Sequence, residues 1–261
     1  MTKKIFFSFV TNQKSIGIVQ ATEKLYGNVN FFNKQPIFDF LQDNEPNVIF
    51  LNEGDYETNH IIYAKHEYPQ VKFVLLKSSE EKIKNNPFDL VLHLNNKKDR
   101  WFIPYLVNEN FTNGKTEEQY STDILFITDQ IEQSEITNKW ISSLGEKYRL
   151  KAYGENKINN PYYLGRVLNQ DYKNIFASTK LVLMLNDMWI YTSIVNNKIP
   201  IVFNKNKTEE FEFSDYSQLD QLCDDALSNF DTNLSKVKLK FDLSDKTYSN
   251  FTKKIFEELY K

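Results

Sequence analysis

The sequence of 261 residues contains a single cysteine, Cys223, which excludes an internal disulfide and a cysteine-based metal cluster. No run approaches the roughly 20 consecutive apolar residues that a membrane-spanning helix needs. The first residues lack a signal-peptide cleavage site and read as the start of a strand. From these absences we expect a protein without a membrane span, located in the cytoplasm.

Several signatures of enzyme chemistry are also missing. The loop at residues 11–15 lacks the GxGxxG fingerprint of dinucleotide-dependent oxidoreductases. No histidine-rich cluster indicates zinc, and no pair of carboxylates at a fixed spacing indicates glycoside hydrolysis. The chain also lacks the Asp-x-Asp motif that metal-dependent sugar transferases use. We therefore expect neither a metal nor a bound cofactor.

The composition that remains is typical of a soluble globular protein, with 41% apolar, 26% charged and 15% aromatic residues, and this balance excludes disorder. The formal net charge is −3. This charge removes the simplest argument for non-specific binding to nucleic acid, although a local basic groove stays compatible with it.

Short apolar runs alternate with helical stretches in two halves of similar order. The first half predicts strands at 5–10, 28–32, 47–52, 71–76 and 90–94, with helices at 15–26, 35–42 and 58–66. The second half predicts strands at 123–127, 149–153, 162–167, 181–185 and 199–203. Its helices are expected at 135–148, 172–178, 189–196, 217–228 and 246–260. Strands that are apolar on both sides and separated by helices indicate parallel sheets covered on both faces.

This order predicts an α/β fold of two Rossmann-like domains facing each other across a cleft. We expect an N-terminal domain at 1–108 and a C-terminal domain at 122–261. The polar stretch between them, 109–121, is interpreted as a linker because it shows no periodicity.

Three segments resemble the GT-B glycosyltransferases, in particular those with a spore-maturation-protein-like glycosyltransferase domain. They are residues 101–111 (WFIPYLVNENF), residues 122–127 (TDILFI), and a series at 153–154, 163–167, 175–183, 186–187 and 198–202. The resemblance implies transfer of a sugar from a nucleotide-sugar, bound mainly by the second domain, to an acceptor bound mainly by the first. In that family the terminal helix often crosses back to the first domain, as 246–260 is able to do.

The donor site is expected at the carboxyl end of the second sheet, where open α/β sheets bind ligands and helix N-termini accept phosphate. The residues assigned to it are Tyr153, Gly154, Gly165, Arg166, Lys180, Asn186, Asp187, Tyr191 and Thr192. Each also has a structural interpretation: a capped packing helix, a surface ion pair, a solvated lysine or a simple glycine turn.

The chain departs from the family at several of these places. Thr128 and Asp129 stand where the family usually has glycine, and Met188 and Tyr191 fall near its donor-binding Arg and Glu. A relative that binds a nucleotide or sugar without catalysis is therefore the alternative to a transferase.

An inverting transfer needs a base near the acceptor hydroxyl, and carboxylates that follow a strand of the first domain are suited to this. Asp55 and Glu53 follow the strand at 47–52, with Gly54 allowing close approach. An acidic turn that caps the next helix explains the same residues. We also place Asn12, Lys14, His60 and His93 on the acceptor side, with a polar loop and structural histidines as the alternatives.

Residues 97–101 (KKDRW) form the only dense basic segment, which fits either nucleic acid or a solvated face. The bias toward Lys, Asn, Ile and Phe resembles the AT-rich genomes of large DNA viruses, whose small sugar transferases glycosylate modified DNA bases. We therefore expect a metal-independent hexosyl- or pentosyltransferase, with a hydroxymethylated base of viral DNA, in an infected host cell, as one hypothesis for its acceptor.

Overall fold

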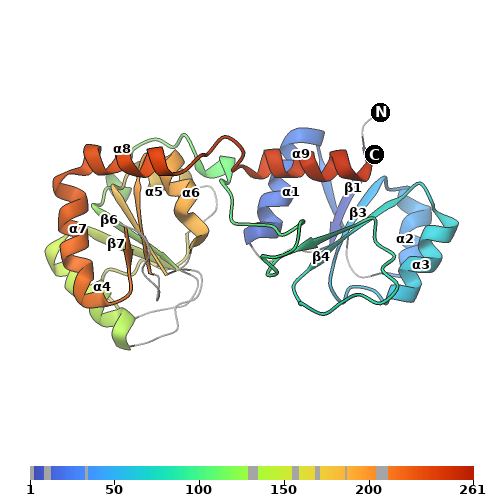
Figure 1. The fold of residues 1–261 in the computed structure, drawn as a ribbon, viewed down its shortest axis with the longest axis horizontal. Helices are drawn as coiled ribbons and strands as arrows, with labels where there is room; N and C mark the ends of the chain where they lie inside the picture. The colour runs from blue at the N-terminus through green and yellow to red at the C-terminus, as the bar shows by residue number, and fades with distance from the viewer. Residues whose placement is uncertain are drawn as a thin grey trace. The chain divides into compact units, whose positions relative to one another are not determined.

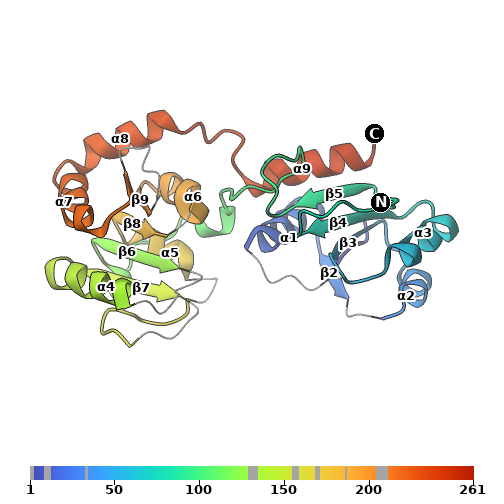
Figure 2. The same cartoon turned by 60° about the horizontal axis from the view of Figure 1, so that its bottom comes forward.

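The computed structural model describes residues 3–8, 13–32, 35–128, 135–154, 159–167, 171–185, 187–203 and 211–261. The chain divides into two compact units (Figures 1 and 2). Unit 1 comprises Met1–Pro104 and Tyr248–Lys261, and unit 2 comprises Tyr105–Thr247. The terminal helix therefore belongs to unit 1, although unit 2 precedes it in the chain.

Unit 1 is built on a parallel sheet in which five strands are described, in the order β2-β1-β3-β4-β5. The strands are β1 (Ile5–Ser8), β2 (Val29–Phe32), β3 (Val48–Asn52), β4 (Lys72–Lys77) and β5 (Leu90–His93). The helices are α1 (Gln13–Tyr26), α2 (Ile37–Asn44), α3 (Thr58–Glu67) and α9 (Tyr248–Leu259).

Neighbouring residues of the unit 1 strands face opposite layers of helices, as the period of two in a strand requires. Phe6 meets Phe40 of α2 edge to face, with ring centroids 4.9 Å apart. Phe7 instead stacks on Phe50 at 4.1 Å, and Phe50 lies 6.3 Å from Phe256 of α9. Helices α2 and α3 thus cover one face of the sheet, and α1 and α9 cover the other (Figure 1).

Unit 2 repeats the same plan with five described strands, all parallel, in the order β10-β9-β8-β6-β7. They are β6 (Ile124–Thr128), β7 (Leu150–Gly154), β8 (Leu181–Met184), β9 (Ile199–Phe203) and β10 (Glu212–Phe213). The helices are α4 (Glu135–Lys147), α5 (Tyr172–Ala177), α6 (Ile190–Val195), α7 (Leu219–Ser228) and α8 (Phe230–Lys240). Short 3₁₀ helices lie at η1 (Glu109–Phe111), η2 (Glu118–Tyr120), η3 (Asp187–Trp189) and η4 (Tyr216–Gln218).

The predicted α/β fold of two Rossmann-like parts is confirmed, and three local expectations need correction. Residues 162–167 form an isolated bridge between Ala152 and Tyr163 instead of a strand. Helix α8 was not predicted. The expected linker lies inside unit 2, because Phe111 is buried in a core and its carbonyl accepts a hydrogen bond from the Asn196 side chain (2.9 Å). The units consequently part after Pro104.

Candidate functional site

Each sheet has one point at which the strand order reverses direction. In unit 1 this point lies between β1 and β3, because the chain adds β2 on one side of β1 and β3 to β5 on the other. In unit 2 the equivalent point lies between β6 and β8. Open α/β sheets bind ligands outside the carboxyl ends of their strands at such points. These two edges are therefore the candidate sites, and each is described separately.

At the unit 1 edge, polar residues join the ends of β1 and β3. The side-chain amide of Asn52 donates a hydrogen bond to the Ser8 hydroxyl (2.8 Å). The Asp55 carboxylate accepts one from the Asn52 backbone N–H (2.7 Å), and Gly54 between them has φ +86°. Asp55 thus closes the turn that follows β3 and does not cap α3, whose N-cap residue Glu57 makes no side-chain hydrogen bond. Asp55 stays half-buried beside the reversal point.

Glu53 is held by the end of β4. Its carboxylate accepts hydrogen bonds from the Lys77 ammonium and the Ser79 hydroxyl, and from the backbone N–H groups of Ser78 (3.0 Å) and Ser79 (2.8 Å). Burial by itself would raise the pKa of Glu53, but the bonds from Lys77 and Ser79 outweigh it and lower the pKa to about 2.

A carboxylate with this pKa accepts a proton poorly at neutral pH, because a general base works best with a pKa near the working pH. The expectation that Glu53 is a catalytic base is therefore corrected: Glu53 is an anion that joins the β3 and β4 ends. The sequence did not single out Lys77, whose side chain is 3% exposed. The sequence signal that could have identified Lys77 is its position as a lysine at the end of an otherwise apolar strand.

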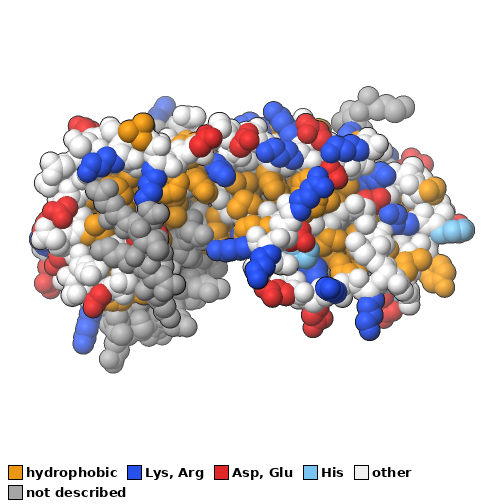
Figure 3. Space-filling view, in the orientation of Figure 1, with side chains coloured by type: hydrophobic (Ala, Val, Ile, Leu, Met, Phe, Trp, Pro, Cys, Tyr) orange, Lys and Arg blue, Asp and Glu red, His pale blue; other side chains and the backbone are white. Residues whose placement is uncertain are grey.

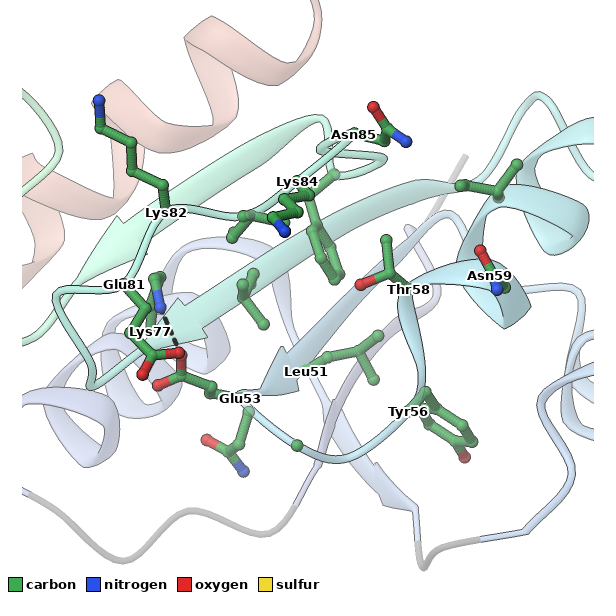
Figure 4. A pocket seen from close by; sticks show the side chains of 16 residues that line it. Leu51, Glu53, Tyr56, Thr58, Asn59, Lys77, Glu81, Lys82, Lys84 and Asn85 are labelled. Carbon is green, nitrogen blue, oxygen red and sulfur yellow. Dashed lines mark hydrogen bonds and ion pairs between the residues drawn. The ribbon is translucent and has the colours of Figure 1, made fainter.

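A cavity of about 430 Å³ opens beside this ion pair, at the carboxyl ends of β3 and β4 and next to the start of α3 (Figure 4). Residues from β3, β4, the first half of α3 and the segment between β4 and β5 line it: Leu51–Gly54, Tyr56, Thr58, Asn59, Ile62, Leu75, Lys77, Glu81–Asn85 and Phe88. The volume is in the range of small-molecule sites. His60 is exposed on α3 and does not line the cavity, and neither does Asp55.

His93 and Lys14 come together at the end of β5. His93 Nε2 lies 3.4 Å from an Asp99 carboxylate oxygen, whereas His93 Nδ1 is buried and has no hydrogen-bond partner among the described residues. Lys14 is buried, donates to the Leu94 carbonyl, and its Nζ lies 4.5 Å from the centre of the Phe102 ring. Both residues are structural neighbours of the first sheet's edge; Asn12 lies outside the described residues.

At the unit 2 edge, Gly154 ends β7, opposite Thr128 of β6. The Gly154 N–H donates to the Gly165 carbonyl (3.1 Å), and the Tyr163 hydroxyl donates to the Gly154 carbonyl (2.5 Å). Gly165 has φ +90°, where a side chain is strained. This turn places the backbone of Arg166, an exposed residue, near the carboxyl end of β7.

Three expected donor residues are corrected by their positions. Lys180 precedes β8, at the amino end of the parallel strands, where its ammonium lies 3.9 Å from the Asp123 carboxylate. Tyr153 is buried in the core, and burial raises its pKa to about 12. Thr192 is 1% exposed within α6. The side chains of these residues therefore do not face a ligand at the carboxyl edge.

The segment after β8 continues into η3 and α6. Met188 and Trp189 are buried there, and the Trp189 ring stacks on Tyr172 with centroids 5.2 Å apart. Tyr191 is half-buried beneath Lys246, whose Nζ lies 6.0 Å from the ring centre. The backbone of Asp187 begins η3, and Asn186 lies outside the described residues.

The described residues contain neither a candidate metal centre nor a candidate membrane-spanning helix. No group of three or more His, Cys, Asp or Glu side chains within that part of the chain is arranged to hold a metal ion. Among the helices described, none has the length and apolar character needed to cross a bilayer.

No protein-family model and no curated protein matches the sequence. Solved structures do resemble the fold. A UDP-N-acetylglucosamine 2-epimerase matches with a TM-score of 0.60 and 12% identity, covering 99% of this chain and 96% of its own. Anabaena HepE, in complex with UDP and glucose, matches with a TM-score of 0.59 and 8% identity, and the match covers 99% of each chain. An alpha1,3-fucosyltransferase with GDP matches with a TM-score of 0.54 and 13% identity, and the match covers 99% of this chain and 89% of the fucosyltransferase.

Proposed function

We propose that the protein is a glycosyltransferase that binds a nucleotide-sugar at the carboxyl edge of unit 2 and transfers the sugar to a hydroxyl acceptor held by unit 1. The observation that carries this proposal is the repeated strand order, which gives each unit its own ligand-binding edge. Structures of this fold that bind UDP or GDP support the choice of ligand.

In the proposed reaction the acceptor oxygen attacks the anomeric carbon while the bond from that carbon to the diphosphate breaks. The nucleoside diphosphate leaves, and a carboxylate takes the acceptor proton. Asp55 is the carboxylate assigned to this step, because Glu53 has a pKa of about 2 and four hydrogen bonds to its carboxylate. Arg166 and the backbone N–H of Gly165 are assigned to the donor diphosphate, which guanidinium and amide groups stabilise as it leaves. The Gly154 N–H is instead bonded to the Gly165 carbonyl and shapes the turn.

The test is a thermal-shift titration with UDP, GDP, UDP-N-acetylglucosamine and GDP-fucose, followed by product analysis. A ligand at 100 times its dissociation constant should stabilise the protein by about 2.7 kcal/mol. Transfer releases free nucleoside diphosphate in proportion to glycosylated acceptor, and addition of a chelator should not change the rate if the reaction is metal-independent. Absence of stabilisation by every nucleotide would contradict the proposal.

The same product analysis distinguishes a transferase from two alternatives, an epimerase and a protein that binds a nucleotide-sugar without turnover. The likeness to epimerases favours a test for an epimer that keeps its nucleotide. Burial of Met188, near the place where the resembling family has a charged donor ligand, favours a relative that binds without turnover. Nucleotide binding with an unchanged nucleotide-sugar after long incubation would identify that relative.

The acceptor hypothesis of a modified base in viral DNA, with a cytoplasmic location, rests on composition. Arg100 of the basic segment 97–101 makes contacts on the surface of unit 1: a guanidinium nitrogen lies 3.6 Å from the Glu258 carboxylate, and the guanidinium carbon lies 5.4 Å from the centre of the Trp101 ring. On the face shown in Figure 3, Lys and Arg side chains are mixed with Asp and Glu rather than gathered into one band. A gel shift with duplex DNA that weakens steeply with salt would support the DNA acceptor.

A further inference from the structure

The cavity beside Glu53 and Lys77 has a floor and a rim of different chemistry. Leu51 and Leu75 of the sheet are buried beneath it, and Ile62 of α3 and Phe88 also line it. The rim carries the polar side chains of Asn52, Thr58, Asn59 and Asn85. Apolar walls with a few hydroxyl and amide groups are typical of pockets that orient small hydroxylated ligands.

The charges around the cavity are unequal. Three lysines and two glutamates line it, a net formal charge of +1 in a chain whose total is −3. Lys77 and Glu53 satisfy each other, which leaves Glu81, Lys82 and Lys84 for a ligand. Figure 4 shows Lys84 projecting toward the space beside Thr58, whereas Lys82 points away from it.

Of the two lysines left for a ligand, we assign Lys84 to it, because Lys82 points away from the cavity. Lys84 forms no ion pair with any described residue, and the first turn of α3, which faces the cavity with Thr58 and Asn59, contains no acidic side chain. Gly54, which also lines the cavity, leaves open space where a Cβ would stand. A ligand with one anionic group is therefore accommodated without a carboxylate directly opposing it on α3.

We propose that this cavity binds a small sugar or polyol that carries one phosphate or carboxylate group. Lys84 pairs with the anion, and Thr58 and Asn59 hydrogen-bond to the hydroxyls. The site is distinct from the nucleotide edge of unit 2. Its identification as the acceptor site, which would make the acceptor an anionic sugar, rests on the proposed function.

The experiment is calorimetric titration of the full chain with glucose 6-phosphate, glucuronate, glucose and inorganic phosphate. The two anionic sugars are expected to bind at least about tenfold more tightly than glucose, a factor that one charge-assisted hydrogen bond supplies. Glucose 6-phosphate should also bind more tightly than phosphate alone, because only the sugar reaches the rim. Tighter binding of the phosphate ester than of glucuronate, or the reverse, identifies the anion.

Lys84→Glu should weaken glucose 6-phosphate binding by at least about tenfold, and Lys84→Gln should weaken it in the same direction. Lys98→Glu is the matched control, since Lys98 is exposed in unit 1 and does not line the cavity. Circular dichroism and melting establish that the variants fold. Equal binding of glucose and glucose 6-phosphate, equal loss in the Lys84 and Lys98 variants, or no binding of any probe would overturn the proposal.

UDP and GDP titrations of the same samples separate the two proposals. Binding of nucleotides without binding of anionic sugars removes the cavity proposal and leaves the proposed function. The reverse result removes the proposed function and retains the cavity as a site. Lys84→Glu is expected to leave nucleotide affinity unchanged, because the nucleotide edge belongs to unit 2.

Discussion

Lys77 and Glu53 form an ion pair in which the lysine side chain is 3% exposed and the glutamate side chain 34% exposed. The pair joins the carboxyl ends of two adjacent strands and forms one wall of the cavity. An almost fully buried ammonium requires a partner, because an unpaired charge in such a place is strongly destabilising. The pair therefore has a structural role that can be measured separately from binding.

Glu53→Gln should destabilise the protein at neutral pH and change its response to acid. The folded-state pKa of about 2 lies below the ordinary value of 4.5, so the ionised carboxylate stabilises the fold above pH 4.5. This contribution is lost as the pH falls from 4.5 through 2. With the discount for exposure, we expect a loss of about 1–2 kcal/mol at pH 7.

Urea unfolding at pH 7 and at successively lower pH checks this expectation. The difference between wild type and Glu53→Gln should shrink as the solution becomes more acidic. Glu81→Gln, at an exposed cavity position, is the control and should show a small effect at all pH values. A difference that stays constant down to pH 2 would show that the glutamate charge does not contribute.

Gly17→Ala tests the packing of α1 against α9. A Cβ at Gly17 would lie 2.4 Å from a ring carbon of Tyr248, so the ring or the helix must shift. Overpacking of this kind costs about 1–3 kcal/mol, whereas alanine at a free helical position gains up to about 1 kcal/mol over glycine. Thermal unfolding should therefore show a lower midpoint.

A double-mutant cycle with Tyr248→Ala provides the control for that clash. Once the ring is removed, Gly17→Ala should be neutral or stabilising. Equal destabilisation in both backgrounds would mean that the loss arises elsewhere in α1. Glu23→Ala, at an exposed position of the same helix, should change stability by no more than about 0.5 kcal/mol.

The two ends of the unit 2 sheet predict opposite results for two basic residues. Arg166→Ala, beside the carboxyl end of β7, should weaken UDP or GDP binding about tenfold. Lys180→Ala, at the amino end of β8, should leave the dissociation constant unchanged. Isothermal titration of both variants checks this, and an equal loss in the two would place the nucleotide elsewhere.

Cys223 should be unreactive in the native protein. Its thiol is fully buried in a core, and burial, with Asp220 and Asp224 nearby, raises its pKa to about 12. Thiol reagents attack the thiolate, so labelling at pH 8 should follow unfolding rather than reagent concentration. Rapid labelling of the folded chain would show that this core opens locally.

Much of the fold was predictable because a parallel strand buried on both faces needs a continuous apolar run, as 48–51 and 181–184 show. Helix α8 escaped prediction because its pattern is mixed, with Leu239 89% exposed and several lysines around it. The interpretation of 109–121 as a linker differs from the structure, because a polar composition does not reveal that one residue, Phe111, is buried in the core of unit 2.

The candidate sites were predictable only to the level of strand ends. Residues that follow strands reach the carboxyl edge, which correctly placed Glu53, Asp55 and Gly154. Their roles depend on partners from other strands. Hydrogen bonds from Lys77 and Ser79 hold Glu53 as an anion. The position of Lys180 before β8 places it at the amino end of the sheet, beside Asp123. Sequence distance does not encode these pairings.

Helix α9 completes unit 1 from the far end of the chain, with Phe256 lying against Tyr26 at 4.2 Å. During translation, most of unit 1 is therefore synthesised before α9, the helix that packs with α1 on one face of its sheet. Unit 2 is continuous in the chain and is able to finish folding first, which inverts the usual order in which domains mature during translation. Until α9 emerges, the nascent first unit lacks the packing that Phe256 provides beside Phe50.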